Sequence, residues 1–344
     1  MGLRILVMAH AYPPYHNAGA EMTLQAVCEH LVSRGHSVDV QLNHPTPHGD
    51  YTRNGVRVHT ATGNADPLVH INKGVDVILC HLENTTRAAV LGEIHSIPTV
   101  HLLHNTDAFN KHAIRRGRCD LAVYNTEWMQ RDYEQWFTAQ RVRPPMSVMM
   151  HPAVEPADYK PKLKGSHDCI TLVNLWDGKG GDVFWQIADR MPERKFLGIK
   201  GAYGEQVIPE ILPENALVLP HQPPNLMWDI YGSTKILLMP STYESYGRTA
   251  VEAACAGVPT IASPTPGLRE ALGNDGTFVS NRADPDEWVA AIKNMLKPAA
   301  YTKAKAGARA IANRQNPRAD LDHVCSAIEE ASRGYFTALA RRAG

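Results

Sequence analysis

Short apolar runs alternate with amphipathic stretches along most of this chain, and this alternation constrains the fold more than any other feature. In the first half, the apolar runs predict β-strands. They are Leu3–Ala9, Ser37–Leu42, Val75–Cys80, Thr99–Leu103, Leu121–Tyr124 and Ser147–Met150. Helical patterns lie between them, over Glu21–Ser33, Thr86–Glu93 and Glu127–Phe137. Strands that alternate with helices in this way predict a parallel sheet covered on both faces.

A second series of the same kind follows a Pro-rich and charged stretch, Pro152–Gly165, which we interpret as an interdomain linker. The strands predicted after it are Ile170–Leu175, Lys195–Ile199, Ala216–Leu219, Ile236–Met239, Thr260–Ala262 and Thr277–Val279. The helices predicted after it are Asp182–Arg190, Met227–Tyr231, Arg248–Ala256, Asp286–Leu296 and a C-terminal region, Pro298–Gly344, broken near Asn316-Pro317. We therefore expect two similar α/β domains with the functional site between them.

Composition and charge exclude several classes of protein. The 344 residues suffice for two domains at roughly 150 residues each, and 44% hydrophobic residues exclude a disordered chain. The 35 basic residues balance the 35 acidic ones, which argues against a general polyanion binder. The N-terminal apolar run lacks a signal-peptide pattern, and no window approaches the roughly 18 apolar residues of a membrane span. We expect a cytoplasmic protein without stable membrane insertion, with peripheral contact at a membrane surface as the alternative.

The six cysteines are scattered and form no C-x2-C pair. This spacing predicts free thiols rather than a zinc site or a disulfide framework.

The segment PSTYESYGRTAVEAACAGVP carries the most information about chemistry. A predicted strand leads into a loop that holds Glu244 and Gly247, and the helix after it carries Glu252. Eight helical residues rise by about 12 Å, comparable to the span of a nucleoside joined through a diphosphate to a sugar. The free amides around Tyr246–Thr249 begin the helix and suit phosphate oxygens. On spacing alone, an acidic turn followed by a surface glutamate remains the alternative.

In this segment the chain resembles the retaining glycosyltransferases of the GT-B fold, specifically glycosyltransferase family 4. The family signature has the form PSxxExxGxxxxEAxAxGxPxIAS, and this chain reads PSTYESYGRTAVEAACAGVPTIAS. The resemblance implies two facing Rossmann-like domains with parallel sheets, and C-terminal helices that cross back to the first domain. It places an acceptor-side domain over residues 1–152, a donor-side domain over 166–320 and a helix packed on the first domain over 321–344.

The resemblance also implies roles for individual residues. His104 matches the family histidine that contacts the donor sugar and phosphate, and Glu244 matches the carboxylate that binds the sugar, so these two are the expected catalytic residues. Glu252 is expected to bind the ribose, and Lys179 in the loop NLWDGKGG the diphosphate. The further expected donor-binding residues are Gly19, Gly201, Ser245, Tyr246, Gly247 and Arg248. Asn174 stands where the family has an arginine, which gives Arg248 a larger expected share of the diphosphate charge.

A basic cluster of Lys111, His112, Arg115, Arg116 and Arg118 follows the His104 loop. It predicts either a contact with an anionic acceptor, a membrane surface or a nucleic acid, or a solvated helix face. Residues expected to contact either donor or acceptor are Asn105, Lys111, Arg115 and Asn174.

The expected function is metal-independent, retaining transfer of a sugar from a nucleotide-diphosphate sugar of UDP or GDP type to an acceptor hydroxyl. The acceptor stays open among a lipid, a glycan, a small molecule, a protein and a modified nucleic acid. The alternatives are a nucleotide-sugar epimerase or phosphorylase of the same fold, and a non-catalytic nucleotide or sugar binder.

We expect no cofactor and no required metal. Asp284-Pro-Asp286 is typical of a helix N-cap, and Asp320-Leu-Asp322 lies in the helical C-terminal region. Glu244, taken as an exposed loop carboxylate, is expected to contribute little stability.

Overall fold

The computed structural model describes residues 2–61, 66–162, 165–202 and 204–343. Residues 163 and 164 of the expected linker, and Gly344 of the expected C-terminal helix, lie outside the described residues. The chain divides into two compact units. The first is Met1–Ala153 together with Pro317–Gly344, and the second is Val154–Asn316.

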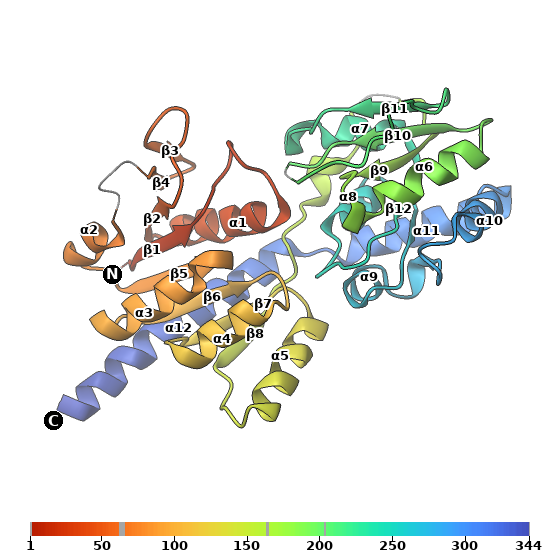
Figure 1. Ribbon diagram of the computed structural model, residues 1–344. Helices are drawn as coiled ribbons and strands as arrows, with labels where there is room; N and C mark the ends of the chain where they lie inside the picture. Colours follow the sequence, from red (N-terminus) through yellow and green to blue (C-terminus); the bar gives the residue numbers. More distant parts are fainter. Residues whose placement is uncertain (1, 62–65, 163–164, 203, 344) are drawn as a thin grey trace. The chain divides into compact units, whose positions relative to one another are not determined.

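The first unit is built on an eight-stranded sheet in the order β3-β4-β2-β1-β5-β6-β7-β8 (Figure 1). Its strands are β1 (Arg4–Ala9), β2 (Ser37–Leu42), β3 (Tyr51–Arg53), β4 (Val56–His59), β5 (Val77–His81), β6 (Thr99–Leu103), β7 (Leu121–Tyr124) and β8 (Met146–Met149). All neighbours pair in parallel except β3 and β4. Six of these strands are predicted from the sequence.

The antiparallel pair β3–β4 is the part of this sheet that was not predicted from the sequence. It turns at Asn54-Gly55, where both residues have positive φ, of 47° and 83°. An Asn-Gly dipeptide is a strong hairpin signal. The polar flanking strands hid that signal, because they give no apolar run.

Alternate residues of β1 enter two different cores, as expected for a sheet covered on both faces. Ile5 and Val7 belong to one core, and Leu6 and Met8 belong to the other. The helices of this unit are α1 (Gly19–Ser33), α2 (Pro67–Asn72), α3 (Thr85–His95), α4 (Ala108–Arg116), α5 (Glu127–Ala139) and α12 (Pro317–Ala343).

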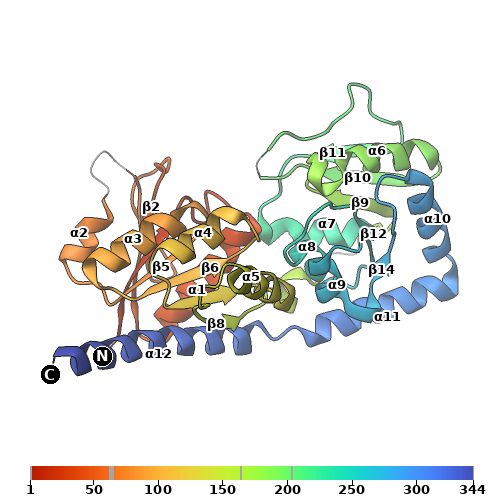
Figure 2. The ribbon, with the colours of Figure 1, turned by 60° about the horizontal axis from the view of Figure 1, so that its bottom comes forward.

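Helix α12 belongs to the first unit although it follows the second unit in the chain. It runs along the first unit and contacts α1, β7 and β8 (Figure 2). Val324 and Ile328 are buried in the same core as Ile5, and Arg34 Nη2 lies 2.8 Å from Glu329 Oε1. These contacts confirm the expectation that the C-terminal helix returns to the first domain. The helical region is interrupted between α11 (Pro298–Arg314) and Pro317, as expected.

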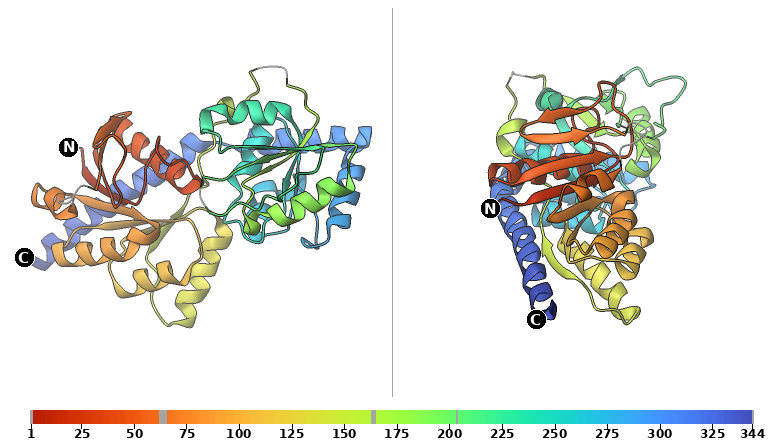
Figure 3. Two further views of the ribbon diagram at one scale, coloured as in Figure 1. Left: turned by 45° about the horizontal axis from the view of Figure 1, so that its top comes forward. Right: turned by 90° about the vertical axis from the view of Figure 1, so that its left-hand side faces the viewer.

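The second unit is built on a six-stranded parallel sheet in the order β11-β10-β9-β12-β13-β14. Its strands are β9 (Cys169–Val173), β10 (Lys195–Ile199), β11 (Ala216–Leu219), β12 (Thr234–Met239), β13 (Thr260–Ala262) and β14 (Thr277–Phe278). Its helices are α6 (Gly181–Arg190), α7 (Met227–Ser233), α8 (Arg248–Cys255), α9 (Pro266–Leu272), α10 (Pro285–Met295) and α11 (Pro298–Arg314). Figure 3 shows helices on both sides of this sheet. All six strands match predicted ones.

Each sheet has one point where the chain reverses its order of strands. In the first unit the chain moves from β1 outward to β2 and later begins again on the other side of β1, at β5. In the second unit the same reversal separates β9 from β12. Ligands of open parallel sheets bind beyond the carboxyl ends of the strands at such a point.

All six cysteines are free thiols, as predicted. Asp284 is the N-cap of α10 and accepts from the Asp286 amide at 2.9 Å, as predicted. No helix within the described residues is both long and apolar enough to span a bilayer.

Candidate functional site

Lys179 and Glu244 meet at the switch point of the second unit. Lys179 closes a short 3-10 helix that follows β9, and Glu244 lies in the loop that follows β12. Lys179 Nζ lies 2.7 Å from Glu244 Oε1, and Ser241 Oγ donates to the same oxygen at 2.8 Å. Glu244 is only 8% exposed. The expectation of an exposed loop carboxylate is therefore wrong, because the ion pair and the neighbouring chain enclose this side chain.

Arg282 holds the two loops of this site together. Its Nε donates to the Pro240 carbonyl at 2.6 Å, and its Nη2 donates to the Asp177 carbonyl at 2.7 Å. The Thr242 amide also donates to the Gly178 carbonyl, at 3.0 Å. Arg282 was not predicted from the sequence, because it lies outside the segments that carry the family resemblance.

Gly247 allows the Glu244 loop to enter helix α8. It is the N-cap of this helix with φ of 98°, a left-handed conformation that favours glycine. A Cβ atom here would lie 2.5 Å from Leu268 Cδ2. The first amides of α8 follow directly, at the positive end of the helix dipole. Tyr246, which was expected to bind donor, packs its side chain in the apolar core of this unit.

Glu252 is buried on α8 within a network of polar side chains. Its Oε1 lies 2.7 Å from Arg248 Nε and 3.0 Å from Tyr159 OH, and its Oε2 lies 2.9 Å from Tyr231 OH. The alternative of a surface glutamate is therefore wrong, since Glu252 is 8% exposed.

The same network fixes the charge of Arg248. Burial lowers the pKa of Arg248, but the Glu252 charge and the Tyr159 hydroxyl outweigh it, and the net direction is upward. Burial and the Glu252 charge raise the pKa of Tyr231 well above its usual range. Arg248 is thus a buried cation that is paired with Glu252 and also contacts the Tyr159 hydroxyl.

Asn174 and Gly201 lie next to each other at the ends of β9 and β10. Asn174 has φ of 71°, and its Oδ1 accepts from the Trp176 amide at 3.2 Å. A Cβ atom on Gly201 would lie 2.3 Å from that oxygen, so a larger residue here would displace the Asn174 amide. Gln206 joins the two loops, because its Oε1 accepts from the Gly201 amide at 2.7 Å and from the Leu175 amide at 3.0 Å.

Ser245, another expected donor-binding residue, lies half-buried in the loop between β12 and α8 of the second unit. The other expected residues lie in the first unit, where several already have partners. Asn105 Oδ1 accepts from Asn110 Nδ2 at 2.8 Å, within the loop that follows β6. Lys111 is buried and pairs with Asp132. Arg115 Nη1 donates to Gln140 Oε1 at 3.0 Å. Of the basic cluster, Arg118 is held by both oxygens of Asp120, at 2.6 and 2.9 Å.

His104 and Gly19 are the two remaining expected residues of the first unit. Gly19 is the exposed first residue of α1. His104 follows β6, and its ring lies 5.4 Å from the ring of His81. Burial lowers the pKa of His104 to about 4, so the imidazole is neutral near pH 7.

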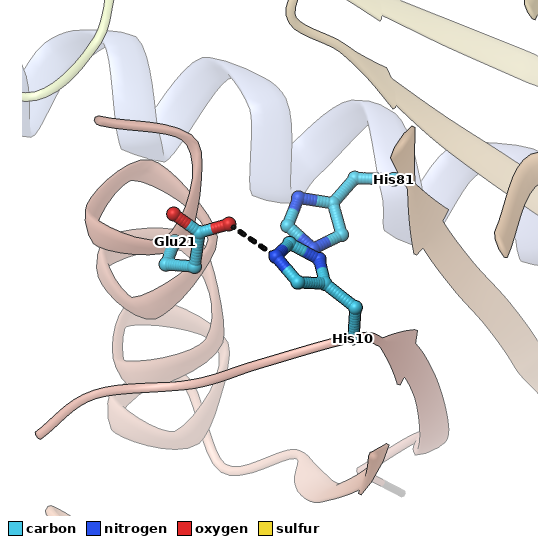
Figure 4. Close-up of side chains that lie close together, drawn as sticks. All are labelled: His10, Glu21 and His81. Atoms are coloured by element: carbon cyan, nitrogen blue, oxygen red, sulfur yellow. Dashed lines mark ion pairs between the residues drawn. The ribbon is translucent and has the colours of Figure 1, made fainter. Parts of the chain in front are cut away.

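His10, Glu21 and His81 converge at the switch point of the first unit (Figure 4). His10 follows β1, Glu21 lies on the first turn of α1, and His81 ends β5. His10 Nε2 lies 3.1 Å from Glu21 Oε1, and the rings of His10 and His81 stack at 5.7 Å. The ligand atoms of the three residues all lie within 4.8 Å of one another, which suits a metal ion.

The charges of this group follow from its burial. Burial lowers the pKa of His81 well below its ordinary value. The hydrogen bond to Glu21 raises the pKa of His10. Burial acts to raise the pKa of Glu21, but hydrogen bonds from His10 and His16 hold it below its usual range. This group was not predicted from the sequence, because its members come from three separate segments.

Comparison with known proteins agrees with the geometry of the second unit. Residues 205–312 match the family model described as glycosyl transferases group 1. The D-inositol 3-phosphate glycosyltransferase of Mycobacterium marinum is 24% identical over 257 residues, which cover 63% of this chain and 54% of that protein. The protein of the same name from Segniliparus rotundus is 32% identical over 126 residues, which cover 35% of this chain and 27% of that protein. This chain thus spans about half the length, or less, of these relatives.

Two solved structures show the fold. Sucrose-phosphate synthase from Thermosynechococcus elongatus has a TM-score of 0.78 at 16% identity, over 98% of this chain and 100% of that one. Anabaena HepE in complex with UDP-glucose has a TM-score of 0.74 at 17% identity, over 96% and 100% of the two chains. The two Rossmann-like parallel sheets and the returning C-terminal helix are those of the GT-B fold, as predicted. Residues 205–312 therefore resemble the glycosyl transferases group 1 family, and the chain as a whole has a GT-B fold.

Proposed function

We propose that this chain is a retaining glycosyltransferase that transfers a sugar from a nucleotide-diphosphate sugar to an acceptor hydroxyl. The observation that carries the proposal is the Lys179–Glu244 pair at the switch point of the second sheet, beside the N-terminus of α8. A cation, a carboxylate and the N-terminal end of a helix at one place provide complementary groups for a diphosphate and for sugar hydroxyls.

Each group has a separate proposed role. Lys179 and the first amides of α8 hold the diphosphate and offset the negative charge that grows on it as the sugar leaves. Glu244 accepts hydrogen bonds from sugar hydroxyls, and Glu252 accepts them from the ribose. Because Lys179 and the helix dipole supply positive charge, we propose that no metal ion is required at the diphosphate.

The buried network around Glu252 changes the role proposed for Arg248. Its guanidinium is 2.7 Å from Glu252 and contacts the Tyr159 hydroxyl at 3.0 Å. We propose that Arg248 orients the Glu252 carboxylate, and that Lys179 carries the larger share of the diphosphate charge.

The first unit contributes His104 and Gly19 in this proposal. A neutral imidazole can donate one N–H to a reactant oxygen. The pKa of about 4 for His104 keeps it neutral at physiological pH. A donor of UDP type is favoured by the similar fold of HepE, which is described with UDP-glucose.

Nucleotide binding to the full chain tests the proposal. UDP, GDP, ADP, CMP and dTDP are titrated by calorimetry and thermal shift, with chelator and then with Mg²⁺. We expect UDP to bind, insensitively to Mg²⁺, and Lys179→Met to weaken it at least tenfold. Lys195→Met is the matched control, because Lys195 pairs with Asp168 at the start of β10, away from the carboxyl ends of the strands.

Two results would contradict the proposal. One is that no nucleotide diphosphate binds, and the other is that Lys179→Met binds as tightly as the wild type. If a product forms, its anomeric configuration by NMR separates retention from inversion.

A further inference from the structure

We propose that His10, Glu21 and His81 bind one divalent transition-metal cation of the zinc type at the switch point of the first unit's sheet. The proposal does not rest on sugar transfer. Two imidazoles and one carboxylate form a ligand set that proteins use for Zn²⁺. The three side chains come from the end of β1, the start of α1 and the end of β5 (Figure 4).

The distances fit a common ion after small side-chain movements. Zinc bonds to imidazole nitrogen and carboxylate oxygen are about 2.0–2.2 Å long, so two tetrahedral ligand atoms lie roughly 3.4 Å apart. His10 Nε2 and Glu21 Oε1 are already 3.1 Å apart. The ligand atoms of all three residues lie within 4.8 Å of one another. Rotation of the His81 ring toward the other two side chains closes the site.

His81 provides the second, independent observation. Its side chain is 0% exposed, and neither ring nitrogen has a hydrogen-bond partner among the described residues. Leaving a buried polar group unpaired costs about 1–3 kcal/mol, so such a group calls for an explanation. Its ring lies beside that of His10 and faces the Glu21 carboxylate (Figure 4). A cation bound to one of its two ring nitrogens would give that nitrogen a partner.

The negative charge of Glu21 favours a cation over an anion as the ligand. Glu21 is only 2% exposed, and its carboxylate lies 3.1 Å from His10 and 3.5 Å from His16. A buried carboxylate repels an anion and attracts a cation. The group therefore suits a metal ion better than a phosphate.

A carboxylate behind His10 completes the arrangement. His10 Nδ1 lies 3.5 Å from Glu83 Oε1, on the side of the ring opposite the Nε2 that faces Glu21. Imidazole ligands of metals commonly direct their other nitrogen to a carboxylate, which fixes the tautomer and the ring orientation. His10 has this second partner available.

The bound cation would hold the segment between β1 and α1 against the sheet. His10 and Glu21 stand at the two ends of the segment that joins β1 to α1, and His81 anchors it to β5. Metal bound to the folded state alone adds to its stability by mass action. A rise in melting temperature is thus expected without any sugar chemistry.

Asp39, His59 and His70 form a second group of the same composition in the first unit. In that group, Arg57 already donates two hydrogen bonds to Asp39, at 2.8 and 2.6 Å. A cation in direct contact with the carboxylate opposes metal binding, so this group serves as the matched control.

The experiment uses the full chain without a polyhistidine tag, stripped with chelator. Zn²⁺ and Co²⁺ are titrated by calorimetry, metal content is measured after gel filtration, and the visible absorption of Co²⁺ reports its ligands. We expect one ion per chain, with His81→Asn and Glu21→Gln each weakening binding at least tenfold. His70→Asn is expected to bind as the wild type does.

Three results would overturn the proposal. Absence of stoichiometric binding to the wild type would overturn the proposal, as would binding that survives both His81→Asn and Glu21→Gln. Loss of binding in His70→Asn alone would move the ion to the other group and also overturn it. Glu21→Gln keeps the shape of the side chain, and its circular dichroism shows whether a loss of binding reflects misfolding.

Discussion

Glu244 Oε1 lies 2.7 Å from Lys179 Nζ, which joins the loops after β9 and β12, the two strands that flank the switch point. Both side chains come from loops, and the loops are tied further by Arg282. In the proposed function, a bound donor exchanges part of this ion pair for contacts to its diphosphate and its sugar. The pair therefore keeps both groups in place before the donor arrives.

Glu244→Gln tests the carboxylate of this pair. We expect turnover to fall on the order of 100-fold, because the amide lacks the charge that acts on the reacting sugar. Stability should fall by about 1–2 kcal/mol, since Lys179 loses a partly buried partner. Kinetics together with urea unfolding measure both effects. Glu214→Gln, at an exposed position, is the control, and equal turnover in the two variants would contradict the assignment.

Glu252→Ala should destabilise the second unit more than a surface substitution would. Arg248 would remain buried without its carboxylate, and breaking a buried pair from one side costs about 3–5 kcal/mol. Denaturant unfolding of the variant measures this loss. Tyr231→Phe removes a single hydrogen bond to Glu252 and should cost about 1 kcal/mol. A loss below about 1 kcal/mol in Glu252→Ala would show that Arg248 finds another partner.

Gly247→Ala and Gly257→Ala form a matched pair. Both glycines have positive φ, of 98° and 76°, so each substitution carries a backbone cost of about 1 kcal/mol. Only Gly247 also meets a neighbour, at 2.5 Å from Leu268 Cδ2, whereas Gly257 faces open space. Gly247→Ala should therefore lower the free energy of unfolding by at least about 1 kcal/mol more than Gly257→Ala does. Thermal unfolding of the two variants measures this difference. Gly247→Ala should also weaken nucleotide binding, while Gly257→Ala should leave binding unchanged.

Ile328→Ala tests the attachment of α12. This side chain is fully buried in the core that it shares with α1 and β1. Its truncation should cost about 2–5 kcal/mol through lost burial and a residual cavity. Hydrogen exchange of the amides of α1 and α12 measures the loss locally. Glu330→Ala, at an exposed position on the same helix, should change stability by less than about 0.5 kcal/mol.

His101 should make stability depend on pH. Burial lowers its pKa to about 4, although the neighbouring Arg118 carbonyl and Asp120 act in the opposite direction. Between this value and the ordinary pKa of 6.5, the unfolded chain binds more protons, so stability falls as pH drops from 6.5 to 4. A tenfold change in proton affinity corresponds to about 1.4 kcal/mol, so the loss of stability is on the order of 3 kcal/mol. Unfolding of His101→Gln across this range should show a shallower slope, and an equal slope would contradict the assignment.

The sequence predicted the two sheets well, because short apolar runs and turn residues are local signals. The family resemblance implied roles for Glu244, Glu252 and Lys179, and the structure places Lys179 and Glu244 in contact. The burial of Glu252 was not predictable, since Tyr159 and Tyr231 reach it across 93 and 21 residues of chain. The His10–Glu21–His81 group was not predictable either, because its contacts also join residues that are far apart in the sequence. Each member alone is an ordinary residue, and only the strand order brings the three together.

The position of α12 at the end of the chain has a consequence for the order in which the two units fold. A nascent chain that ends before Pro317 already contains every strand of both sheets, and the second unit is complete. The first unit, although begun first, lacks the helix that contributes Val324 and Ile328 to its core. Domains generally fold as units during synthesis, so the second unit can finish folding on the ribosome before the first. Until then, the apolar residues of α1 and β1 lack the cover that Val324 and Ile328 of α12 provide.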